Sequence, residues 1–164
     1  ELLKGVHYLL KAFKELNLQD AELILVGNLL PEVQHILNDY QGSYKHLGPK
    51  TKDELKEIYQ QADVLVLPSI QEAFGLVLLE AMASGLPVIA TDQTGGVDFI
   101  KDYYNGFLVP IRSIKGLKEK IAFLYKNRQE SHEMGLNARA FVEKHYNKEL
   151  YGFRLKENLK AIIP

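Results

Sequence analysis

A chain of 164 residues is long enough for one domain, which would bury about two-thirds of the surface that the unfolded chain exposes. The formal net charge of −1 lacks the basic surplus of a dedicated nucleic-acid-binding protein, so we expect no nucleic-acid partner. The sequence contains no cysteine, which excludes disulfides, thiolate metal sites and cysteine nucleophiles.

The first part of the chain alternates between helical and strand-like patterns. Leu9, Phe13 and Leu16 recur at helical spacing. A short apolar run that ends at Gly27 is typical of a buried parallel strand, and Pro31 suits the first turn of the next helix. These patterns predict helices over about 5–17 and from Pro31, and strands over 22–27 and 44–47.

The middle of the chain contains a helix-start signature. Thr51 and Glu54 have the spacing of a capping box, in which each side chain binds the backbone N–H group of the other residue. This spacing predicts a helix that begins after Thr51 and runs to about Gln61. The apolar run that follows, residues 63–68, predicts another buried strand.

The rest of the chain continues this alternation. Gly85 ends the helical pattern of residues 75–84, and the runs 87–90 and 106–110 have strand character. Helical segments follow, over 114–124, 129–144 and 148–161. Strands that alternate with helices form βαβ units, so we expect an α/β fold with a Rossmann-like, doubly wound, mostly parallel sheet and C-terminal helices.

Polar residues and a glycine follow the predicted strand that ends near Leu67. Ligands of open α/β sheets bind outside the carboxyl ends of the strands, and residues 68–75 lie at such an end. The next helix would present unpaired N–H groups and the positive end of its dipole, which suit a phosphate. Gly75 would allow a close approach of the backbone to a ligand, because it has no side chain.

Glu80 is the only charged residue between Ala73 and Thr91, on a helix that is otherwise largely apolar. A buried and unpaired carboxylate is strongly unfavourable, so a buried Glu80 would need hydrogen-bond donors. The two neighbouring hydroxyls of a ribose would be suitable donors. The alternative is a partly solvated helix face from which Glu80 points into water.

Residues 68–90 have the pattern Pro-Ser-x-x-Glu-Ala-Phe-Gly-Leu-x-x-x-Glu-Ala-Met-Ala-x-Gly-x-Pro-Val-Ile-Ala. This pattern resembles the signature of retaining GT-B glycosyltransferases of family 4, also called group 1. In that family the signature lies in the C-terminal donor-binding domain. Ala73 stands where glycine is also common. The resemblance implies that Glu72 contacts hydroxyls of the donor sugar and that Glu80 holds the nucleotide ribose. Sugar and diphosphate would be cradled by the backbone N–H groups around Phe74, Gly75, Leu76 and Val77.

Lys4-Gly5 stands where the family has a lysine-glycine pair before the first helix. The resemblance implies that Lys4 neutralises donor phosphate as a point charge; the alternative is a solvated terminal lysine. Lys4 and Glu72 are therefore the candidate catalytic residues. Lys4 and the helix start near Gly75 would stabilise the departing diphosphate.

Three shorter matches extend the resemblance. His46-Leu47-Gly48 lies where family members run main chain past the nucleotide base, which implies substrate binding by Gly48. The other two matches are to later glycine turns of the family, and ordinary turn glycines are the alternative. These matches are Gly95-Gly96 and Asn105-Gly106.

Two parts of the family pattern are missing from residues 1–164. The family's domain opens with a strand that ends in Gly-Arg, and the first strand is central in the doubly wound order, so we expect a gap in the sheet. Residues ahead of Glu1 or another chain would have to supply that strand. An N-terminal domain that binds the acceptor, a sugar or a lipid, is also missing. We therefore expect little or no transferase activity from residues 1–164 alone.

Other kinds of site have little support. The five histidines lack metal-ligand spacing, so we expect no metal and no cofactor besides the nucleoside diphosphate sugar substrate. The glycine motifs of P-loop and dinucleotide-binding proteins do not occur. We find no membrane-spanning run and no signal peptide, and we expect a cytoplasmic protein. Without a net positive charge, peripheral membrane contact is unsupported.

The sequence therefore predicts the donor-binding domain of a retaining glycosyltransferase, which transfers a sugar from a nucleoside diphosphate sugar to an unidentified acceptor. A second hypothesis comes from another functional class. It is a regulatory or scaffold domain that binds a nucleotide or a sugar phosphate without transfer.

Overall fold

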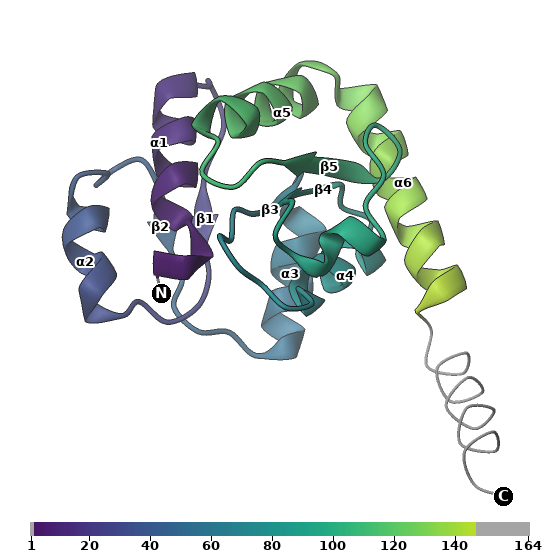
Figure 1. The fold of residues 1–164 in the computed structure, drawn as a ribbon, viewed down its shortest axis with the longest axis horizontal. Helices are drawn as coiled ribbons and strands as arrows, with labels where there is room; N and C mark the ends of the chain where they lie inside the picture. Colours follow the sequence, from purple (N-terminus) through teal and green to yellow (C-terminus); the bar gives the residue numbers. More distant parts are fainter. Residues whose placement is uncertain (1, 147–164) are drawn as a thin grey trace, which may run out of the picture.

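The computed structural model describes residues 2–146 and contains the expected alternation of helices and strands (Figure 1). A short 3-10 helix, η1 (Leu2–Lys4), precedes the first α-helix, and a second, η2 (Gly95–Asp98), follows β4. The α-helices are α1 (Val6–Leu16), α2 (Pro31–Asn38), α3 (Lys52–Gln61), α4 (Leu76–Ala83), α5 (Ile114–Lys126) and α6 (Arg128–His145). The strands are β1 (Ile24–Leu25), β2 (Lys45–His46), β3 (Leu65–Leu67), β4 (Val88–Thr91) and β5 (Gly106–Val109).

Within the described residues these bounds follow the sequence prediction closely, although several strands are shorter than predicted. The strand predicted over 22–27 is reduced to the two residues of β1. The helix predicted over 148–161 lies outside the described residues. Within residues 2–146, no helix is long and apolar enough to cross a lipid bilayer.

All strand pairs in the described residues are parallel, as the sequence predicts, but they form two separate sheets. β1 pairs with β2. β3, β4 and β5 form the other sheet, in that order. The two strands before α3 and the three strands after it thus belong to different sheets. This is the gap in the sheet that the sequence predicts.

Helices cover both faces of the three-stranded sheet, and β4 contributes to the core on each side (Figure 1). Val88 and Ala90 belong to a hydrophobic cluster with residues of α3, α4 and α6. Ile89, which lies between them, belongs to a second cluster with residues of α1 and α5. Successive strand residues point to opposite faces, so this division of the core confirms the Rossmann-like, doubly wound layout.

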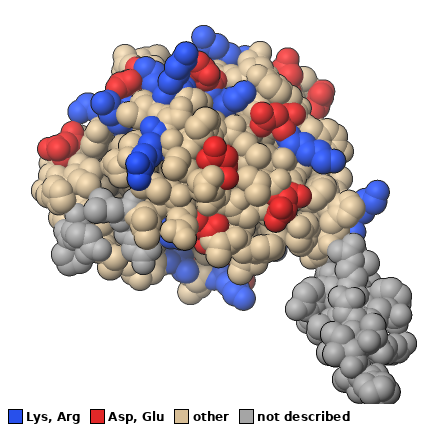
Figure 2. All heavy atoms as spheres, in the orientation of Figure 1, with Lys and Arg blue, Asp and Glu red and all other residues tan. Residues whose placement is uncertain are grey.

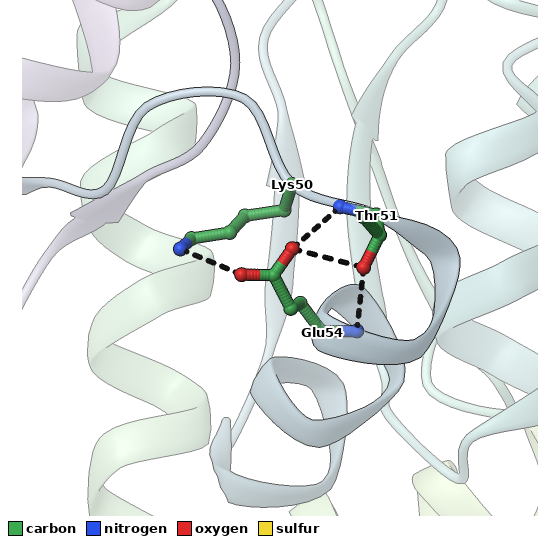
Figure 3. Close-up of polar contacts among 3 residues, drawn as sticks. All are labelled: Lys50, Thr51 and Glu54. Atoms are coloured by element: carbon green, nitrogen blue, oxygen red, sulfur yellow. Dashed lines mark hydrogen bonds and ion pairs between the residues drawn. The ribbon is translucent and has the colours of Figure 1, made fainter.

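α3 begins with the predicted capping box (Figure 3). The Glu54 N–H group donates to the Thr51 hydroxyl at 3.4 Å, and the Thr51 N–H group donates to the Glu54 carboxylate at 2.8 Å. The Lys50 ammonium donates to the other carboxylate oxygen at 3.0 Å. The backbone bond from Thr51, followed by the Lys50 and Thr51 side chains, lowers the pKa of Glu54 to about 2. These contacts fix the start of α3, the helix that carries Tyr59.

Candidate functional site

Lys4 and Glu72 form an ion pair, although 68 residues separate them along the chain. Lys4 ends η1, and Glu72 lies in the loop between β3 and α4. The main chain joins the same two segments, because the Ile70 N–H group donates to the Leu3 carbonyl at 2.7 Å. The side chains of Lys4 and Glu72 remain 45% and 22% exposed, so both charged groups are accessible to a ligand.

Gly5 allows these two segments to approach each other. Its φ of 64° lies in the left-handed region, and a Cβ at this position would overlap the carbonyl oxygen of Pro68. Glycine satisfies both requirements, since it tolerates positive φ and has no Cβ. The Lys-Gly pair noted in the sequence therefore has a steric basis: Gly5 lies against the loop, which puts Lys4 within reach of Glu72.

The loop before α4 is also held by the segment after β4. The Glu72 N–H group donates to the Gln93 carbonyl at 3.1 Å. Gly95 is buried, and a Cβ on it would stand 2.5 Å from the carbonyl oxygen of Phe74. Gly95 is therefore required for close packing against this loop, which goes beyond the role of an ordinary turn glycine.

α4 begins at Gly75, which adopts the left-handed conformation with a φ of 76°. The first N–H groups of an α-helix have no intrahelical partner, and the dipole favours an anion at this end. Phe74, Leu76 and Val77 are 42%, 64% and 38% exposed. The helix start that the sequence predicts as a phosphate site is thus at the protein surface.

Glu80 lies on the exposed face of α4, which answers the question that the sequence left open. The buried residues of this helix are Leu78, Leu79, Ala81 and Met82. The Glu80 carboxylate has a protein donor, the hydroxyl of Tyr59 on α3, at 3.4 Å. Burial of Tyr59, followed by the negative charge of Glu80, raises the pKa of Tyr59 to about 12. The hydroxyl therefore keeps its proton, and remains a donor, at neutral pH.

A family model described as "Glycosyl transferases group 1" matches residues 1–141. The chain belongs to this family of glycosyltransferases. An uncharacterised glycosyltransferase of Methanocaldococcus jannaschii is 34% identical over 142 residues, which are 86% of this chain and 40% of that protein. CapM of Staphylococcus aureus, a capsular polysaccharide biosynthesis glycosyltransferase, is 30% identical over 153 residues, which are 90% of this chain and 40% of that protein.

Solved glycosyltransferase structures share the fold. Sucrose-phosphate synthase from Thermosynechococcus elongatus is similar with a TM-score of 0.89 at 26% identity, over 99% of this chain and 43% of that chain. HepE of Anabaena in complex with UDP-glucose has a TM-score of 0.87 at 23% identity, over 98% of this chain and 46% of that chain. The chain thus forms a Rossmann-like half of the GT-B fold, and it spans less than half of each of these proteins.

Gly48 is tied to a different part of this glycosyltransferase domain. Its carbonyl accepts from the Gly27 N–H group at 2.9 Å, and Nε2 of His46 lies 2.8 Å from the Gly27 carbonyl oxygen. Gly48 therefore closes the end of the β1–β2 pair. Among the described residues, no hydrogen bond joins it to Lys4, Glu72 or Glu80.

The Asn105-Gly106 match has a structural explanation. The buried Asn105 amide accepts from the Lys101 N–H group at 2.7 Å and donates to the Phe99 carbonyl at 3.0 Å. A Cβ on Gly106 would overlap the carbonyl oxygen of Val88 on the neighbouring strand. These two residues shape the turn into β5 and lie in the core of the glycosyltransferase domain.

Sequence reasoning missed Tyr59, a residue only 8% exposed that resembles an ordinary core residue of α3. It also missed two buried atoms without a hydrogen-bond partner in the described part of the chain, Nδ1 of His7 and Oγ of Ser69. They lie close in sequence to Gly5 and Pro68, where the two segments meet. Among residues 2–146, no group of three or more acidic or histidine side chains could hold a metal ion. The expectation of a site without metal stays a prediction.

Proposed function

We propose that this chain is the part of a retaining glycosyltransferase that binds the nucleoside diphosphate sugar donor. The observation that carries the proposal is the Lys4–Glu72 ion pair just ahead of the exposed start of α4, with Glu80 one turn further along that helix. A cation, a helix N-terminus and two accessible carboxylates together suit a ligand that contains a diphosphate between two groups rich in hydroxyls.

The diphosphate would bind between the Lys4 ammonium and the first N–H groups of α4. Negative charge grows on the phosphate oxygens as the bond between sugar and diphosphate breaks, and the same groups would stabilise it. Because Lys4 and the helix start can supply this positive charge, we propose that donor binding needs no divalent cation.

The two glutamates would have different roles. Glu72 would accept hydrogen bonds from the donor sugar, and Glu80 from the ribose diol. Their order along the chain, with the helix start between them, matches the order of sugar, diphosphate and ribose in the donor. Backbone N–H groups from Phe74 to Val77 would line the sugar and diphosphate, and Gly48 would lie near the base.

Transfer would need more than this chain supplies. The relatives are more than twice as long as the segment that they share with it. We propose that the acceptor, a sugar or a lipid, binds to a second domain, and that residues 1–164 alone bind the donor with little or no transfer. HepE, which has the same fold, was solved with UDP-glucose, and this supports a donor of that class.

Calorimetric titration of UDP and of GDP into the purified protein tests this proposal. We expect weak, saturable binding of at least one of them, unchanged by a metal chelator and weakened in Lys4→Ala. If a protein with native circular dichroism and a cooperative unfolding transition binds neither, the proposal is wrong. Binding without any sugar transfer by a protein that includes an acceptor domain would favour the second hypothesis, a regulatory or scaffold domain.

A further inference from the structure

The exposed face of α4 leaves the Glu80 side chain with little steric restraint. Its neighbours on that face are themselves exposed, namely Leu76, Val77 and Ala83. An exposed glutamate samples many rotamers, and selecting one of them on binding has an entropic cost. A partner that fixes the orientation of the carboxylate before binding would lower this entropic cost. The carboxylate would then bind the two hydroxyls of a ribose diol with higher affinity.

Tyr59 is placed to act as that partner. Its ring is buried in the cluster that includes Leu78 and Met82 of α4, so the position of the ring is fixed by packing. Its hydroxyl donates to Oε2 of Glu80 at 3.4 Å. A buried tyrosine usually directs its hydroxyl to an acceptor, and among the described residues that acceptor is Glu80.

We propose that Tyr59 is a positioning residue that holds the Glu80 carboxylate in the orientation that accepts the two ribose hydroxyls. This inference rests on the proposed function, because it requires that Glu80 binds ribose. Tyr59 touches no part of the donor. It acts by restricting Glu80 before the nucleotide arrives, so its contribution is to affinity.

Tyr59→Phe removes the hydroxyl and keeps the buried ring. We expect it to raise the Kd for the nucleoside diphosphate by about three- to tenfold, the range for ordering one additional side chain on binding. Tyr125→Phe is the matched control, because its hydroxyl donates to the Gln19 carbonyl at 2.9 Å and neither residue belongs to the site. The control should leave the Kd unchanged.

Two comparisons separate positioning from a general structural effect. With the dideoxyribose form of the same nucleotide, which lacks both hydroxyls, Tyr59→Phe should have almost no effect. In a Glu80→Ala background it should likewise add almost nothing, since the group that it positions is gone. Equal losses for both nucleotides, or full additivity with Glu80→Ala, would overturn the inference.

Nucleotide binding by wild type and by Glu80→Ala shows whether a negative result concerns Tyr59 alone or the whole donor site. If wild-type protein binds neither UDP nor GDP, both are wrong. If Glu80→Ala weakens binding and folded Tyr59→Phe does not, only the role of Tyr59 is wrong.

A measurement without nucleotide covers the case in which Tyr59→Phe does not fold. In protein with labelled tyrosine, the NMR signal of the Tyr59 phenol carbon at neutral pH should differ between wild type and Glu80→Ala, which removes the acceptor of its hydroxyl. The signal of Tyr125, whose hydroxyl has another acceptor, should be the same in both proteins. An identical Tyr59 signal in both proteins would show that no such contact exists in solution, and would overturn the inference.

Discussion

The Lys4 ammonium and the Glu72 carboxylate are each other's partners in the described structure, although the proposed donor would use them at different places. The pair is partly solvated, and exposed ion pairs contribute little net stability. A donor that supplies a phosphate to Lys4 and hydroxyls to Glu72 can therefore compete with this pair at small cost. The pairing also keeps both side chains close to the positions in which they would be needed.

Lys4→Ala tests this interpretation of the ion pair. We expect the free energy of unfolding to fall by less than about 1 kcal/mol, while the Kd for a nucleoside diphosphate rises about tenfold or more because a charged phosphate contact is lost. Lys45→Ala is a suitable control, since it also removes an exposed ion pair, with Glu22. Urea unfolding and calorimetry measure the two effects. A large loss of stability with unchanged affinity would make the pair structural.

Gly5→Ala should be more damaging than its size suggests. It combines an unfavourable positive φ with overlap between Cβ and the Pro68 carbonyl oxygen, so we expect a loss of about 3 kcal/mol or more. Gly42→Ala is the control: its φ is 81° and a Cβ would meet nothing within 4 Å, so only the conformational cost of about 1 kcal/mol applies. Urea unfolding compares the two variants. Equal losses would mean that the contact with Pro68 is unimportant.

The capping box should make stability depend on acidic pH. The pKa of Glu54 is lowered from 4.5 to about 2, so its contribution is complete above pH 4.5 and is lost as pH falls from there towards about 2. The stability difference between wild type and Glu54→Gln should shrink over this window. Thr51→Ala should cost about 1 kcal/mol. Thermal unfolding across this pH range measures these effects, and a constant difference for Glu54→Gln would contradict the assignment.

His7 should contribute a second pH dependence, closer to neutrality. Burial lowers the pKa of its imidazole below the ordinary value of 6.5. As pH falls below 6.5, the unfolded chain takes up a proton at this residue before the folded protein does, so stability should decline. His7→Gln should remove that part of the decline, and His132→Gln, at an exposed position, should not. Urea midpoints at a series of pH values provide the test, and equal slopes for wild type and His7→Gln would refute it.

Most helices and strands could be predicted because their signals are local. Pro31 marks the start of α2, and Thr51 with Glu54 marks the start of α3, within a few residues in each case. The apolar run of β4 identifies a buried strand in the same way. Each of these signals involves residues only a few positions apart, so it can be recognised in the sequence without knowledge of the fold.

The site was predictable only in part. No local pattern shows that Lys4 meets Glu72, because that contact depends on Gly5 lying against Pro68. The orientation of Glu80 was hidden because Leu76 and Val77, both apolar, share its exposed face, so α4 lacks the alternation of apolar and polar faces that reveals a solvent side. Tyr59 was missed because its ring is a core residue and only its hydroxyl belongs to the site.

If the two glutamates hold different parts of one donor, removing each of them should weaken a different set of ligands. The Kd values of a nucleoside diphosphate and of its sugar-bearing form, for example UDP and UDP-glucose, would be measured for wild type, Glu72→Ala and Glu80→Ala. We predict that Glu80→Ala weakens both ligands by a similar factor, about tenfold, and that Glu72→Ala weakens mainly the sugar-bearing form. Unchanged affinities in both variants, while wild type binds, would show that neither glutamate holds the donor.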